Sequence, residues 1–229
     1  MIKTEIREKL LSLEADNYRK YNETLLSSKS KIIGIKLGAV RKIAKELSKS
    51  DWRIYVESLD AGDYFEEKLV AGISIFYSDA DIYEKIKYSK KFTPFVDGWA
   101  VCDSVYMTPK LKNNEKKPFH DYAVECAFTE DEFTARVGLV SLLHSFTEDE
   151  YIDEIFEIIN KIHFVGEYDR LAASWLMAEC MAKCPERTKK LMKLCTVENK
   201  VYNKGITKMR ESFRVSDEMK DILKTMVRK

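Results

Sequence analysis

Apolar residues recur along most of this chain at the three- and four-residue spacing of one face of an α-helix. The clearest stretch follows Asp63, where Phe65, Leu69, Ile73 and Phe76 keep that spacing. Further apolar residues beside them widen the stripe, as expected for a helix that packs against a core. The pattern therefore predicts a helix from Asp63 onward.

Two capping-box patterns, Thr129 with Glu132 and Thr147 with Glu150, predict two more helix starts. The interval between them leaves room for one helix and a short turn. Similar patterns predict further helices near residues 2–14, 17–27, 38–49, 51–60, 80–89, 96–107, 117–127, 167–183, 186–195, 198–212 and 217–228.

Many short helices with tight turns predict an all-α fold of stacked antiparallel pairs, an α-solenoid of HEAT type. The chain has only 8 glycines and 4 prolines in 229 residues, which also favours helices. Exact repeats are absent, so the prediction rests on helix length and number. Residues 108–118 are the most loop-like stretch but do not resemble a linker, and we expect a single domain over residues 1–229. The concave side of such an array suits an elongated ligand.

Composition limits the functional classes only weakly. The chain is 45% hydrophobic and 34% charged, as in ordinary globular proteins with a highly charged surface. It has no apolar run long enough to cross a membrane, and its charged N-terminus is unlike a signal peptide, so we expect a cytoplasmic protein. The net charge of +1 gives no support for nucleic-acid binding, which would have to depend on local clusters of positive charge.

Common catalytic motifs are missing. There is no glycine-rich phosphate loop, nucleophilic triad or pair of metal ligands, and the three histidines lack metal-site or hydrolase spacing (His120, His144, His163). Five cysteines form an odd set without zinc-module spacing, and we expect them to be reduced and buried (Cys102, Cys126, Cys180, Cys184, Cys195). Cys180 and Cys184 lie one helical turn apart and could share a metal, but no histidine is near them in sequence. An enzyme built from this chain would have to use carboxylates, aromatic rings and arginine.

The most informative pair is Trp99 and Asp103, within residues 95–103. In a helix the two side chains lie one turn apart on the same face. An aromatic face beside a carboxylate is a good receptor for a cation. Taken singly, each also has an ordinary explanation, because tryptophan is typical of cores and aspartate of helix surfaces.

Arg136 and Trp175 are two further candidates. Arg136 lies within an apolar helix pattern, so its side chain extends to the surface, pairs with a buried acid, or contacts an anion in a groove. Trp175, by itself, is also typical of a helix core.

Taken together, these segments resemble the AlkD-like DNA alkylation repair family, and the resemblance covers most of the chain. Residues 95–103 resemble the family signature, and residues 133–140 and 168–175 resemble the helices that carry its arginine and second tryptophan. Residues 34–46 and 203–212 are similar to its early and C-terminal segments. The sequence departs from the family pattern at Gly38, where proline is expected, and at Leu171, where lysine is frequent.

The resemblance implies a HEAT-like glycosylase that removes N3- or N7-alkylated purines from double-stranded DNA, with no metal and no cofactor. It implies that Asp103 is the catalytic carboxylate, that Trp99 lies against the sugar, that Arg136 holds a phosphate, and that Trp175 is a second groove aromatic. We expect these four to line one groove of a monomer that has no membrane partner. Lesion preference stays open.

Three clusters of positive charge are candidate DNA contacts, although each is also typical of a solvated helix face. They consist of Lys36, Arg41, Lys42 and Lys45; Lys110, Lys112, Lys116 and Lys117; and Lys200, Lys204 and Lys208. Two alternatives stay open. One is a non-catalytic family relative that binds damaged or branched DNA, and the other is a HEAT-like protein-interaction scaffold.

Overall fold

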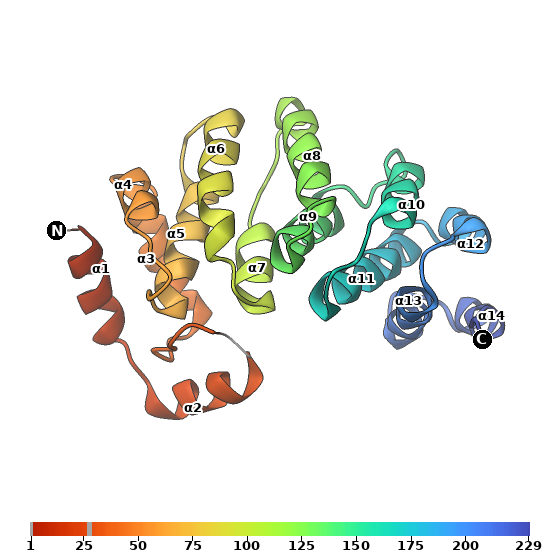
Figure 1. Ribbon diagram of the computed structural model, residues 1–229, viewed down its shortest axis with the longest axis horizontal. Helices are drawn as coiled ribbons and strands as arrows, with labels where there is room; N and C mark the ends of the chain where they lie inside the picture. The colour runs from red at the N-terminus through yellow and green to blue at the C-terminus, as the bar shows by residue number, and fades with distance from the viewer. Residues whose placement is uncertain (1, 27–28) are drawn as a thin grey trace. The chain divides into compact units, whose positions relative to one another are not determined.

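A computed structural model describes residues 2–26 and 29–229 of the chain (Figure 1). Within these residues there are fourteen α-helices, one short 3₁₀ helix and no strands, and the helices pack in neighbouring pairs as in an α-solenoid of helical repeats. The predicted fold class is therefore confirmed. Contacts group the chain into two compact units, residues 1–119 and residues 120–229, and each is described by itself. That the whole chain is one domain stays a prediction.

The first unit contains α1 to α7 and the beginning of α8. Its elements are α1 (Ile2–Leu11), α2 (Asp16–Leu25), α3 (Leu37–Leu47), α4 (Trp52–Glu57), α5 (Phe65–Tyr77), α6 (Ile82–Phe92), η1 (Thr93–Phe95), α7 (Trp99–Tyr106) and α8 (Asn113–Ala127). Figure 1 shows α3, α5 and α7 in one row, and α5 contacts both of its neighbours. Helices α1, α4 and α6 pack against this row or one another.

The second unit repeats the arrangement. It contains the rest of α8 and α9 (Glu132–Ser145), α10 (Ile152–Lys161), α11 (Glu167–Lys183), α12 (Pro185–Leu194), α13 (Asn199–Glu211) and α14 (Asp217–Thr225). Helix α11 lies between α9 and α13 and makes extensive contacts with both (Figure 1). Helices α10, α12 and α14 cover this row.

Buried aromatic residues fill the core of each unit. Trp52, Tyr106 and Phe92 are almost fully buried in the first, and Phe146 and Phe156 in the second. Helix α5 is apolar on nearly every side, because α3, α4, α6 and α7 all contact it. This central position explains why its apolar stripe was the widest in the sequence.

Both capping-box predictions are wrong. Thr129 donates to the carbonyl of Cys126 at 2.9 Å and lies just beyond the end of α8, while Thr147 donates to the carbonyl of Leu143 at the end of α9. The cap of α9 is instead Asp131, whose carboxylate accepts from the amide of Thr134 at 2.8 Å. A threonine hydroxyl can bond either to the helix before it or to the helix after it, and the motif alone does not distinguish the two.

Most other predicted boundaries agree with the structure to within three residues, as helix ends usually do. The larger difference is at α8, which begins four residues before the predicted 117 and takes in part of the loop expected at residues 108–118. Residue 27 of the predicted helix 17–27 lies outside the described residues. Among those described, no helix combines the length and apolar character that crossing a bilayer requires.

Candidate DNA-contacting site

Trp99 and Asp103 lie one turn apart on α7, in the first unit. Both are partly exposed, whereas Ala100, Val101 and Cys102 between them are buried. Gly98 precedes the helix in an extended conformation, and its carbonyl accepts from the amide of Cys102 at 3.2 Å. Because residues four apart share a helix face, the indole and the carboxylate lie on the accessible side of α7, together with the partly exposed Ser104, while the other residues of the helix are buried.

Arg41, a predicted DNA contact on α3, reaches the C-terminal end of α7. Its guanidinium donates to the Ser104 carbonyl at 3.3 Å, to the Tyr77 hydroxyl at 3.1 Å and to the Thr108 hydroxyl at 3.4 Å. A cation is favourable at a helix C-terminus, where carbonyl groups concentrate negative potential. Arg41 therefore links α3 to the helix that carries Asp103, and a role in binding DNA stays a prediction.

Five other predicted cations of this unit are exposed lysines. They make no ion pair with any residue that the structure describes, and they stand on or before α3 or in the loop after α7: Lys36, Lys42, Lys45, Lys110 and Lys112. An unpaired lysine can approach a phosphate without first giving up an acidic partner. These side chains therefore keep their full positive charge available to a polyanion.

Arg136, in the second unit, is almost fully buried on α9. Its guanidinium donates to the carbonyl of Tyr168 at 2.8 Å. The amide of the same Tyr168 donates to Glu132 on α9 at 2.6 Å, so α9 holds the first turn of α11 by two side chains. Of the three sequence interpretations of Arg136, extension to the surface is wrong, since only 5% of the residue is exposed.

Trp175 lies on α11, where it lines a pocket of about 200 Å³ with Lys208 of α13. A second pocket of about 320 Å³ lies between the same two helices and is lined by Leu171, Lys200 and Lys204. The lining residues recur at helical spacing on both helices, so the two pockets follow one groove, which we call the α11–α13 groove.

Acidic residues neutralise part of this groove. Lys200 pairs with Glu167 at 2.5 Å, and Lys208 pairs with Glu211 at 3.0 Å. The hydrogen bond from Lys200 lowers the pKa of Glu167, so this acid is charged at neutral pH. Lys204 makes no ion pair within the described part of the chain. The predicted lysine series therefore lies along the groove, but only Lys204 is unpaired.

The structure thus describes two half-sites. Trp99, Asp103 and Arg41 belong to the first unit, whereas Arg136, Trp175 and the three groove lysines belong to the second. That the four principal residues meet in one groove stays a prediction.

Three consecutive charged residues at the start of α5 were not predicted to be important: Glu66, Glu67 and Lys68, which we call the charged triplet. Each is at most 2% exposed. Charged residues are rarely buried without partners, and each of these contacts a different neighbouring segment. The sequence contains one signal, because the triplet begins a helix whose remaining residues are mostly apolar and leave no polar face on which three charges could be exposed.

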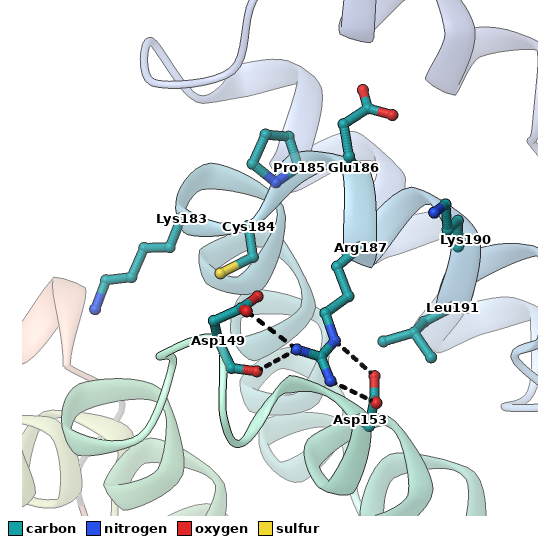
Figure 2. A pocket seen from close by; sticks show the side chains of 9 residues that line it. All are labelled: Asp149, Asp153, Lys183, Cys184, Pro185, Glu186, Arg187, Lys190 and Leu191. Carbon is teal, nitrogen blue, oxygen red and sulfur yellow. Dashed lines mark hydrogen bonds and ion pairs between the residues drawn. The ribbon is translucent and has the colours of Figure 1, made fainter.

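A pocket of about 860 Å³ lies elsewhere in the second unit, beside the start of α12. Figure 2 shows Arg187 between Asp149 and Asp153, with Cys184 nearby. The hydrogen bond from Arg187 lowers the pKa of Asp153. Arg187 is therefore already engaged by two carboxylates. None of the predicted site residues lines this pocket.

Cysteines and acids add no further site. Four of the five cysteines are buried as predicted, but Cys184 is partly exposed. Burial and the nearby Asp149 raise the pKa of its thiol. In the part of the chain that the structure describes, no three His, Cys, Asp or Glu side chains are grouped as metal ligands.

Comparison with known proteins identifies the family. The family model described as DNA alkylation repair enzyme matches residues 6–200, which include α7, α9 and α11. No curated protein and no solved structure gives a significant match. Because the family match covers most of the chain, the chain belongs to the DNA alkylation repair enzyme family, as its resemblance predicted.

Proposed function

We propose that this chain is a DNA glycosylase that hydrolyses the N-glycosidic bond of N3- or N7-alkylated purines in duplex DNA, without metal or cofactor. The observation that carries the proposal is the accessible pair on α7, where Trp99 and Asp103 share the one open face of a buried helix. Membership of an alkylation repair family supplies the class of substrate.

One carboxylate is sufficient for this chemistry. An N3- or N7-alkylated purine is cationic, so it leaves with the electron pair of the C1′–N bond as a neutral base and needs no strong general acid. Positive charge then develops on the sugar as an oxocarbenium ion. The carboxylate of Asp103 stabilises that charge and accepts a proton from the water that adds to C1′. The indole of Trp99 adds about 0.5–2 kcal/mol of cation–π attraction.

The second unit contributes groups that bind the DNA backbone. Trp175 and Lys204 line the α11–α13 groove, which offers an aromatic surface and an unpaired cation to the sugar-phosphate chain. The family resemblance assigns Arg136 a phosphate contact, for which the guanidinium fork is suited. The proposal requires both half-sites to contact the same lesion.

Incubating the protein with duplex DNA that carries 7-methylguanine tests this function. Released base, at a rate that EDTA does not change, supports the glycosylase. Salt-sensitive binding of the duplex without base release favours a non-catalytic DNA-binding relative. If the protein does not bind DNA, the scaffold alternative is favoured. An unmodified duplex of the same sequence is the control.

A further inference from the structure

Helix α7 is too short to hold its own position. It has eight residues, and the residue before it is Gly98, which has no side chain with which to cap the first turn. Isolated helices of fewer than about 12 residues are marginal in water. The positions of Trp99 and Asp103 therefore depend on what the neighbouring segments do to the ends of α7.

A buried ion pair lies just before the helix. The ammonium group of Lys68, in the first turn of α5, contacts the Asp97 carboxylate at 2.9 Å. The hydroxyl of Ser30 donates to the same carboxylate oxygen at 2.5 Å. The side chain of Lys68 is 3% exposed and that of Asp97 is 16% exposed. Asp97 is two residues before Trp99, so this pair fixes the backbone from which the indole extends.

Stability alone does not explain this pair. Burying two charges costs desolvation, and well-packed apolar residues are often at least as stable in the same place. The other carboxylate oxygen of Asp97, Oδ1, is buried and has no hydrogen-bond partner among the described residues. A carboxylate left half-satisfied is a poor stabiliser, because an unpaired buried acceptor is costly. What the pair supplies is a defined position for the turn.

The first turn of α5 is a rigid reference for that position. Glu66 of the charged triplet accepts from the amides of Ile33, Gly34 and Ile35 at 2.9, 2.7 and 3.2 Å. Lys68 therefore extends from a turn that these three hydrogen bonds hold against residues 33–35.

We propose that Lys68 and Asp97 are positioning residues that set where α7 begins and thereby aim Trp99 and, one turn later, Asp103. The assignment rests on the proposed function for its effect on catalysis. Its effect on Trp99 is independent of that function. Both consequences are measurable.

The kinetic test separates positioning from stability. Lys68→Met and Asp97→Asn each leave one buried charge unpaired, so each lowers the Tm. The double variant leaves neither charge, and its Tm recovers towards wild type. If the pair positions α7, kcat for 7-methylguanine release by the double variant stays low, on the order of 10²-fold below wild type, because small misplacements are costly. KM changes little, since DNA affinity depends on the lysines. Recovery of kcat together with Tm overturns the assignment.

Fluorescence gives a readout that needs no activity. Trp52→Phe and Trp175→Phe leave Trp99 as the only tryptophan of the three in the chain. Adding Lys68→Met and Asp97→Asn to this background should shift the Trp99 emission to the red and increase its quenching by acrylamide. An unshifted emission overturns the assignment, whatever the activity. A shifted emission in a chain whose wild type releases no base refutes the proposed function and supports the positioning role.

Arg7→Met is the matched control. It also removes a cation that pairs with buried carboxylates, since Arg7 contacts Glu67 and Asp63 at 2.9 and 2.8 Å. We expect this variant to have a lower Tm. Its Trp99 emission, and its kcat measured below the temperature of thermal unfolding, should be those of wild type. If Arg7→Met changes both as much as the double variant does, the effect is general loosening of the unit and the assignment is wrong.

Discussion

Glu167→Gln should make the protein bind DNA more tightly. Glu167 pairs with Lys200 at the edge of the α11–α13 groove, and both side chains are more than half exposed. The substitution frees Lys200 and removes a negative charge from a surface that is proposed to face phosphates.

The size of the effect follows from this geometry. Breaking an exposed ion pair costs about 0.2–1 kcal/mol. In the variant, Lys200 can contact a phosphate without this cost. Removing a carboxylate roughly 8 Å from a phosphate in water adds about 0.2–0.5 kcal/mol once salt screening is included. The sum corresponds to an affinity increase of about 2- to 10-fold. One additional phosphate contact would also steepen the dependence of log K on log salt by about 0.9.

Fluorescence anisotropy with a labelled duplex at several salt concentrations measures both quantities. The control is Glu157→Gln on α10, because Glu157 pairs with Lys161 at 3.4 Å and is similarly exposed. The two variants change net charge equally, but Glu157 is outside the groove. Equal affinities for the two variants would refute the groove as a DNA-binding surface.

Three further predictions concern stability. Glu66→Gln leaves at least one of the three bonded amides without an acceptor, so it should destabilise the protein by about 2–4 kcal/mol. Scanning calorimetry should show a Tm lower by about 5–15 °C. An unchanged Tm would contradict the three-amide contact. Gly138→Ala places a Cβ against the backbone of Ala127, so α8 and α9 must separate. Urea unfolding should show that the free energy of unfolding falls by about 1–3 kcal/mol. An unchanged free energy of unfolding would show that the two helices do not pack this closely. Hydrogen bonding from Arg214 lowers the pKa of Glu179 in the folded protein. The pair therefore stabilises the fold above the unfolded pKa of about 4.3, and this stabilisation is lost as the pH falls through the lower folded pKa. Glu179→Gln should therefore cost about 1 kcal/mol at pH 7, and this cost should shrink as the pH falls below the unfolded pKa. A pH-independent difference in Tm would refute that reasoning.

Helical periodicity was sufficient to predict the fold class, because a solenoid of helix pairs needs only local patterns. Helices α5 and α11 show this, since their apolar stripes have the spacing that packing between two neighbours requires. The capping motifs failed because Thr129 and Thr147 bond to the preceding helix, a choice that depends on tertiary context.

The candidate site was less predictable. The i, i+4 spacing of Trp99 and Asp103 correctly predicted that they share one face of a helix, and the structure shows that both are partly exposed. The pairing of Lys200 with Glu167, and the burial of Arg136, depend on which helices meet in three dimensions. The contact between Lys68 and Asp97 joins residues 29 positions apart, and no local pattern reveals it.

A single-turnover rate measurement on duplex DNA that carries 7-methylguanine tests whether the Asp103 carboxylate stabilises the sugar as the glycosidic bond breaks. Asp103→Asn keeps the size of the side chain and removes its charge. We expect a rate constant lower by on the order of 10²–10³, with an affinity for DNA no lower than that of wild type. Base release by Asp103→Asn at the wild-type rate would contradict it.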